Sequence, residues 1–391
     1  MKKALGFAIA AALLAATPAR ATNGMRMIGF GPVQNSMGGA SVAAPLDGTT
    51  AVTNPAGLSA LGPRLDLSAE AFMPSPKYSF SAGGGAMAAN GSSDRPTDYL
   101  PTLAGVFRLQ DQLALGFAAL GTAGMGVDYA RDPMGDKLYT SYVNGRIAPA
   151  VAYRVNDQLS VGLALNLMYA QMGFEMGGGP RFSPTGSFGY GATVGVSYAP
   201  VEMVTIGAAY ESQSTFQDFK WTVMGTQFAV QFNQPQVATL GVAVRPAAGL
   251  LLALDGQWIN WSAVMGKDLP KFAKPAGAPS FDMGWKDQMV VKVGAQYEIP
   301  SLKELKVRAG YNYGAMPLDK ERPNQNMAFP AVAEHHFTLG AGYDVGTLSI
   351  LAAFVYSPES KITTSIPAAG VDSIESKMSQ ASFEVGGAYR F

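Results

Sequence analysis

The 391-residue chain contains no cysteine and only two histidines. It therefore cannot form a disulfide scaffold, a zinc–thiolate site or the active site of a thiol enzyme. Charged residues make up 14% of the sequence, against roughly 25% in ordinary soluble domains. The 28 basic residues balance the 28 acidic residues, so the basic excess that nucleic-acid phosphates require is missing. After the first twenty residues, no apolar run reaches the ~20 residues of a transmembrane helix. These absences leave a weakly charged, glycine-rich β protein or a membrane β-barrel.

The first 21 residues have the features of a secretory signal peptide. Lys2 and Lys3 precede an apolar run over residues 4–16, and small residues follow up to Ala21. A basic start, a short apolar segment and small residues before the cleavage position are typical of such signals. We therefore predict a signal peptide over residues 1–21, with cleavage after Ala21 and export of the rest of the chain.

The exported part alternates apolar and polar residues with a period of two. In residues 159–169 the odd positions are leucine, valine or tyrosine, whereas the even positions are mostly small or polar. Residues 305–314 and 382–391 follow the same pattern. This alternation is typical of β-strands with one apolar and one polar face.

The spacing of these strands predicts their number. An aromatic residue precedes a short turn or the C-terminus about every 46 residues, with one double interval after Tyr198; the positions are Phe107, Tyr153, Tyr198, Tyr297, Tyr343 and Tyr389. Each interval fits a strand, a tight turn, a second strand and a longer loop. With the missing position inside the double interval there are seven such strand ends, and seven strands with seven partners predict fourteen strands. An even strand number with short turns on one side is typical of outer-membrane barrels. Such a sheet must close, because an open edge in hydrocarbon leaves backbone groups unpaired. A soluble β-sandwich or propeller is the alternative.

We therefore predict an all-β fold, a 14-stranded antiparallel transmembrane β-barrel over residues 63–391. The strands are expected near residues 64–80, 99–109, 112–122, 141–155, 158–171, 187–199, 203–213, 235–246, 250–262, 288–299, 305–314, 335–344, 347–357 and 379–391. Tyrosines at the strand ends, together with Trp258 or Trp261, are expected at the membrane interfaces.

Residues 22–62 lack the alternation and are rich in glycine and small apolar residues. Fourteen strands enclose a lumen too wide for the lining side chains to fill, because eight strands are already just filled. We predict that residues 22–62 form a small N-terminal hatch that plugs the barrel. A disordered leader is the alternative, but the segment is not highly charged.

Several motifs are similar to those of FadL-type transporters, the OmpP1/FadL/TodX family of Gram-negative outer membranes. The hatch carries Gly38-Gly39-Ala40, then Asp47, then Asn54-Pro55-Ala56-Gly57-Leu58. Further similar segments span residues 148–154, 257–262, 307–311 and 330–336. The resemblance implies a fourteen-stranded monomeric barrel with an N-terminal hatch, and passive uptake of hydrophobic molecules without nucleotide, metal or other cofactor. It also implies release sideways through the wall at a kinked third strand that Asn54 and Pro55 face.

The loop after the seventh strand is unusually aromatic. It contains Phe216, Phe219, Trp221, Met224, Phe228 and Phe232. We interpret these side chains as an extracellular groove that captures the substrate. The alternative is an extension of the seventh and eighth strands above the membrane, and both can hold together.

The third strand carries Gly116, Gly121 and Gly124. Because glycine in a strand marks a bend or a close approach, these three residues are candidates for the kink. Close packing in the lumen is the alternative role.

A fatty acid would also need a basic partner for its carboxylate. Arg146 and Arg308 are our candidates, because both are predicted to face inward near the middle of a strand. The inward-facing charges, which include Arg108, Arg154, Glu211, Asp255 and Lys292, could instead pair with one another. If acids saturate both candidate arginines, a neutral aromatic hydrocarbon becomes the better substrate.

Catalysis finds no support in the sequence. His335 and His336 are adjacent on a predicted strand and therefore point to opposite faces, and no nucleophile motif is present. We predict long-chain fatty acids as substrates and outer-membrane lipid and lipopolysaccharide as the surroundings. The alternatives to a transporter are an adhesin or structural surface barrel and a general porin, whose lumen the hatch would obstruct.

Overall fold

The computed structural model describes residues 23–95, 97–278 and 280–391, so the predicted signal peptide lies outside the described residues. Fourteen long strands of this part of the chain form one antiparallel barrel, which pairing between the first and last strands closes. The strands are β1 (Arg64–Ala82), β3 (Asp98–Gln110), β4 (Leu113–Met125), β6 (Leu138–Arg154), β7 (Leu159–Glu175), β8 (Phe182–Val201), β9 (Val204–Glu211), β13 (Val237–Ala247), β14 (Leu250–Ile259), β16 (Gln288–Glu298), β17 (Leu305–Gly314), β18 (His335–Val345), β19 (Leu348–Ile366) and β20 (Val371–Arg390). The predicted fold class and strand number are confirmed.

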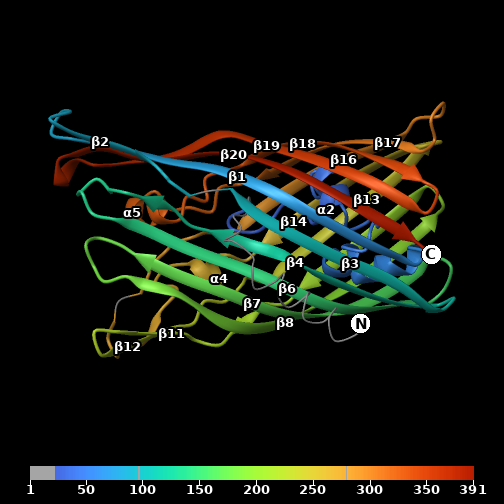
Figure 1. Ribbon diagram of the computed structural model, residues 1–391, viewed down its shortest axis with the longest axis horizontal. Coiled ribbons are helices and arrows are strands. Elements are labelled where there is room, and N and C mark those ends of the chain that lie inside the picture. The colour runs from blue at the N-terminus through green and yellow to red at the C-terminus, as the bar shows by residue number, and fades with distance from the viewer. Residues whose placement is uncertain (1–22, 96, 279) are drawn as a thin grey trace.

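Short elements occupy the loops and the lumen. They are β2 (Met87–Ser92), β5 (Asp128–Tyr129), β10 (Thr215–Phe216), β11 (Phe219–Val223), β12 (Thr226–Val230), β15 (Phe272–Lys274), α2 (Gly31–Ser36), α3 (Thr50–Thr53), η1 (Pro55–Ala60), α4 (Ser262–Met265), α5 (Pro323–Ala328) and η2 (Pro367–Ala369). Among the described residues, no helix has the length and apolar character needed to cross a membrane. The short turns lie at the end of the barrel that holds the C-terminus, and the long loops lie at the opposite end (Figure 1). By the usual asymmetry of such barrels, the loop end is extracellular.

The alternation along the strands sorts side chains between the outer face and the lumen. In β7, Leu163, Leu165 and Leu167 are 42–51% exposed, whereas Ala164 and Asn166 are fully buried. The outer wall is therefore apolar, as a surface facing lipid must be.

Of the two tryptophans expected as alternatives at a membrane interface, Trp261 does not lie there. Strand β14 ends at Ile259, and the turn into α4 brings Trp261 into the lumen, where it is fully buried. Its ring packs edge-on against Trp285, with ring centroids 5.1 Å apart. Trp258 remains at the strand end, and its Nε1 donates to Asp287 over 3.1 Å.

Several strands are longer than predicted and extend beyond the membrane on the loop side. Strands β19 and β20 continue past the predicted ends to meet at η2, and β1 continues beside them to pair with β2. Together β2, β1, β20 and β19 form the protruding sheet at the upper left of Figure 1. The alternation does not mark these extensions, because their outward residues are serine, threonine, lysine and glutamate rather than apolar.

Residues 23–62 contribute α2, α3 and η1 and lie inside the barrel, nearer the end with the short turns (Figure 1). The wall accommodates them through inward-facing glycines. A Cβ on Gly162 would lie 2.3 Å from the Ala56 nitrogen, and one on Gly207 would lie 2.1 Å from the Val42 oxygen. The hatch backbone is therefore in direct contact with the wall backbone at these positions.

Charged wall residues bind the hatch. The Asp255 carboxylate accepts hydrogen bonds from the backbone N–H groups of Ser41 (2.8 Å) and Val42 (3.0 Å). The ammonium group of Lys292 donates to the Ile28 carbonyl over 3.0 Å. Asp255 and Lys292 are directly opposite each other on β14 and β16, as expected for inward charges that pair, but their hydrogen bonds go to the hatch backbone.

Wall side chains also bind the hatch backbone at the periplasmic end. Arg108 and Arg154 both donate to the Ser59 carbonyl, over 2.6 and 2.7 Å. The hatch is therefore fixed through its backbone by side chains from around the wall.

One acid of the hatch itself is also affected by its surroundings. Burial raises the pKa of Asp47 to about 6, and the neighbouring Asp66 adds to the rise.

Candidate functional site

The extracellular end of the lumen holds a cluster of aromatic side chains. The loop between β9 and β13 folds into the β11–β12 hairpin, which joins β15 in a separate three-stranded sheet. Ring centroids of Phe174 and Phe182 lie 5.6 and 5.7 Å from that of Trp221. Phe228 lies 5.0 Å from Phe182. These rings form one continuous apolar surface, to which the ends of β7 and β8 and the β11–β12 hairpin contribute.

The structure places the six predicted capture residues in three environments. Phe216, Phe219, Trp221 and Phe232 are buried, and Phe228 is half-buried in the cluster. Met224 is 95% exposed at the tip of the β11–β12 hairpin, with a φ of 49°, and is not part of the cluster. The alternative of a strand extension applies to β10, which continues the sheet by pairing with β8.

Sequence reasoning missed four members of this cluster. Its further members are Phe174, Phe182, Phe272 and Phe281. Phe174 is the last but one residue of β7, and Phe182 is the first residue of β8. Phe272 and Phe281 come from the loop after β14. A groove of about 290 Å³ borders the cluster, and its lining includes Trp221, Phe228, Lys220 and Lys274.

Below the aromatic cluster, the lumen core is rich in methionine. One contiguous buried cluster reaches from the hatch to the loops and includes Met25, Met27, Met125, Met168, Met172, Met265, Met283, Met327 and Met378. Methionine is unbranched and polarizable, so such a core can repack around an inserted molecule. The loop that carries α5 contributes to this core through the buried residues Met327 and Ala328, and the Thr140 hydroxyl donates to the Ala328 carbonyl over 2.6 Å.

The third barrel strand, β4, leaves its neighbour β3 part of the way along. Pairing between the two stops at Thr102 and Leu120, although β4 continues to Met125. A register shift against β6 falls between Gly121 and Ala123. From Leu120 onward the alternation of buried and exposed residues is lost, because nearly every residue is buried. The strand therefore forms a bulge between Leu120 and Ala123 and departs from the regular barrel sheet there.

The first described residues of the chain fill the space beside the bulge. Arg26 and Ala123 form an antiparallel bridge. The Gly124 N–H donates to the Met25 carbonyl over 2.9 Å, and the Met27 N–H donates to the Thr122 carbonyl over 3.1 Å. Residues 23–27, here called the N-terminal segment, thus provide the backbone partners that β3 does not.

The three candidate kink glycines differ in their surroundings. Gly121 and Gly124 flank the bulge, as just described. Gly116 lies in regular pairing with Val106 and Ala150, and a Cβ there would lie 2.6 Å from a methyl carbon of Leu58. For Gly116 the structure therefore matches the alternative role, close packing against the hatch.

The expectation that Asn54 and Pro55 face the third strand is wrong. Asn54 donates to the Val196 carbonyl over 3.0 Å, and Pro55 lies against Gly162 and Gly195. These partners belong to β7 and β8. The neighbouring Ala56 contacts Gly162, and Gly38 and Gly39 lie in the turn after α2, with φ values of 65° and 78°. Within η1 and the turn before it, Leu58 is the residue that reaches Gly116 of β4.

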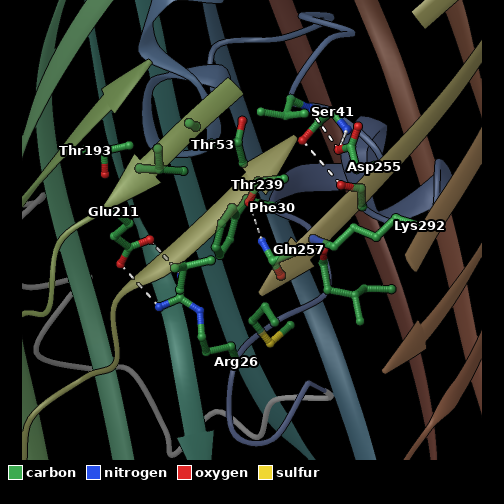
Figure 2. A pocket seen from close by; sticks show the side chains of 17 residues that line it. Arg26, Phe30, Ser41, Thr53, Thr193, Glu211, Thr239, Asp255, Gln257 and Lys292 are labelled. Carbon is green, nitrogen blue, oxygen red and sulfur yellow. Dashed lines mark hydrogen bonds and ion pairs between the residues drawn. The ribbon is translucent and has the colours of Figure 1, made fainter. Parts of the chain in front are cut away.

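Arg146 lies in a buried charge cluster at the centre of the lumen. The Glu211 carboxylate forms an ion pair with Arg26 over 2.8 Å and a second ion pair with Arg146. Figure 2 shows Arg26 reaching from the N-terminal segment to Glu211 on the wall. Two guanidinium groups share one carboxylate, and Nε and Nη1 of Arg146 have no hydrogen-bond partner among the described residues. Acids therefore do not saturate Arg146, which keeps unused donors in a buried site.

Arg308 lies in a different environment. Its Nε donates to Gln296 over 2.8 Å, and it lines a cavity of about 130 Å³ at the periplasmic end together with Arg64, Lys306 and Asp344. This cavity is polar and lies on the far side of the hatch from the aromatic cluster. Arg308 is thus separated from Arg146 and from the apolar core.

A closed barrel with an apolar outer wall, an internal hatch and an apolar lumen core defines a channel of the outer-membrane type. The chain belongs to the family of outer membrane transport proteins described as "Outer membrane protein transport protein (OMPP1/FadL/TodX)", whose sequence model matches residues 17–387. This family consists of transport proteins of Gram-negative outer membranes rather than enzymes. None of the curated protein sequences matches the chain.

Solved structures of three proteins are similar in fold. The toluene transporter TodX of P. putida is 19% identical, with a TM-score of 0.74 over 93% of this chain and 99% of its own. A FadL homologue of Pseudomonas aeruginosa is 16% identical, with a TM-score of 0.76 over 94% of this chain and 100% of its own. The toluene transporter TbuX of Ralstonia pickettii is 20% identical, with a TM-score of 0.70 over 93% of this chain and 99% of its own. At these identities the likeness concerns the fold.

Proposed function

We propose that this protein takes up long-chain fatty acids across the outer membrane. The observation that carries the proposal is a continuous apolar core that runs from the extracellular aromatic cluster to the incompletely paired Arg146. Burial of each CH₂ of an acyl chain contributes about 0.8 kcal/mol, so a long chain needs little specific chemistry. The unused donors of Arg146 suit the carboxylate end of such a molecule.

The proposed route begins at the aromatic cluster and continues through the methionine-rich core. The carboxylate then competes with Glu211 for Arg146. Because Arg26 shares the same Glu211, a change in this cluster is coupled to the N-terminal segment. The segment leaves the bulge of β4, and the ligand leaves sideways between β3 and β4, where the two strands are not paired above Leu120.

Uptake of neutral aromatic hydrocarbons is the second candidate function. The rings around Trp221 offer faces and edges on which a flat ring can stack. Two of the proteins of similar fold are toluene transporters. The same route would serve, but Arg146 would then have no role in binding the substrate.

Labelled oleate and labelled toluene uptake distinguish the two functions. Cells that lack their own transporter are compared with and without this chain. We expect faster oleate uptake with the chain. Unchanged oleate uptake together with faster toluene uptake would reverse the two proposals, and no change in either would reject both.

The aromatic cluster provides a first mutational test. Replacing Trp221 by alanine should reduce the initial uptake rate of oleate about tenfold, a loss of about 1.4 kcal/mol, since the truncation removes apolar surface on which the substrate is captured. Met224→Ala is the matched control, because Met224 is on the same hairpin but 95% exposed. The measurement is initial uptake at equal surface expression. Equal losses in both variants would place capture elsewhere.

A further inference from the structure

A row of three lysines crosses the outer face of the protruding sheet. Lys77 on β1 is directly opposite Lys377 on β20, which is directly opposite Lys361 on β19. Their side chains are 40%, 27% and 61% exposed. The row therefore presents three ammonium groups on neighbouring strands.

The row lies just above the apolar wall. Met73 and Phe383 are exposed apolar residues on the same outward faces of β1 and β20. Lys77 follows Met73 by four residues, which at ~3.3 Å per residue and a tilt of ~45° places it about 9 Å further from the membrane centre. We assign this level, just beyond the exposed apolar residues, to the polar headgroups of the outer leaflet.

Like charges directly opposite each other on neighbouring strands destabilise a sheet, and this row contains two such pairs. Two glutamates offset part of the cost. Glu375 contacts Lys361 at 2.8 Å and Lys377 at 3.3 Å, whereas Glu359 lies 3.7 Å from Lys77. Three lysines against two glutamates leave one positive charge uncompensated, so an external anion would complete the pairing.

We propose that Lys77, Lys361 and Lys377 bind the phosphate groups of the outer-leaflet glycolipid, the lipid A part of lipopolysaccharide. Lysine binds phosphate as a mobile point charge, and basic residues at a membrane surface attract anionic lipid. The acyl chains of the same molecule would lie against the apolar wall below, on Met73 and Phe383. A ligand with phosphates above and acyl chains below matches both parts of this surface. The proposal depends on the outer-membrane location and not on the transported substrate.

Native mass spectrometry of the purified barrel with added bisphosphorylated lipid A tests the proposal. The variant carrying K77Q, K361Q and K377Q should retain the lipid about tenfold or more weakly than the parent protein. The control carries K267Q, K271Q and K286Q, which remove three exposed lysines from the loop between β14 and β16. Oleate uptake should stay unchanged in both. Equal lipid retention in the two variants would overturn the proposal.

A second variant tests the same surface by gain of binding. E359Q together with E375Q removes the internal competitors for the lysines and should tighten retention of bisphosphorylated lipid A. Lipid A without phosphates should bind both this variant and the parent weakly, and inorganic phosphate at the same concentration should not displace the bound lipid. If the E359Q and E375Q variant retained bisphosphorylated lipid A more weakly than the parent, or if inorganic phosphate displaced the bound lipid, a glycolipid site would be contradicted.

Discussion

Replacing Gly207 by valine should open an ion-conducting path through the barrel. A Cβ at this position would lie 2.1 Å from the Val42 oxygen and 2.8 Å from the Ala43 Cα. Overpacking against backbone of this kind costs about 1–3 kcal/mol or more, and the closed wall can yield less than the hatch. We expect single-channel conductance to rise from little steady current in the parent protein to long-lived open events.

Gly256→Val is the matched control for this experiment. Gly256 is exposed on β14, and the nearest atom to a Cβ there is the Leu240 oxygen at 4.0 Å. This variant should remain as closed as the parent. A Gly207→Val barrel that folds, as shown by its heat-modifiable gel mobility, yet carries no more current than Gly256→Val would contradict the contact between hatch and wall.

Replacing Arg146 by glutamine should weaken oleate binding about 10- to 100-fold, because a hydrogen bond to a charged group contributes about 1.5–3 kcal/mol. Glu211 would keep Arg26 as its partner, so no carboxylate is left unpaired by the substitution. Toluene uptake should not change. Fluorescence titration with a labelled fatty acid, together with uptake of both substrates, measures the effect.

Arg308→Gln is the control, because Arg308 bonds to a neutral side chain at the periplasmic end. It should alter oleate binding by less than about threefold, which corresponds to less than 1 kcal/mol. If Arg308→Gln had the larger effect, the carboxylate would bind on the periplasmic side of the hatch. If neither substitution mattered, a neutral hydrocarbon would be the better substrate.

The strand number was predictable because the 46-residue interval depends only on the local alternation and on turns. The lengths of β19 and β20 were not predictable in the same way. Beyond the membrane their outward residues, such as Lys361 and Lys377, are polar. The alternation between an apolar outer face and a polar inner face is therefore lost there. A barrel strand that leaves the lipid therefore loses its main sequence signal.

The parts of the candidate site that lie within one segment of the sequence were predictable. The aromatic density of residues 216–232 is visible in the sequence, and Gly121 and Gly124 flank the bulge of β4. The partners of these residues come from other loops: Phe174, Phe182 and Phe281 meet Trp221 or one another only in three dimensions.

The charge clusters show the same limit. Alternation predicts that Arg146 and Glu211 point inward, but it cannot predict which residues meet across a wide lumen. Arg26 was not predicted as a site residue, because it lies in a segment without alternation. For Asp255 and Lys292 the partners are backbone groups of the hatch, and no sequence pattern marks those groups.

On the proposed route the N-terminal segment leaves β4 before a hydrophobic ligand can pass, and a reversible cross-link between the two tests this step. Arg26 and Ala123 are bridge partners flanked by two backbone hydrogen bonds, an arrangement that places the Cα atoms about 4.5 Å apart, within disulfide range. The chain has no cysteine of its own, so the double variant R26C with A123C forms a single defined pair. Each single variant controls for the loss of the native side chain.

The measurement is oleate uptake by the oxidised double variant before and after addition of a reductant. We expect uptake to be at least about tenfold slower while the segment is locked, a difference of about 1.4 kcal/mol or more in the barrier, and reduction to restore the rate of the R26C variant. Equal rates in the locked and reduced states would show that the ligand crosses with the N-terminal segment still paired to β4.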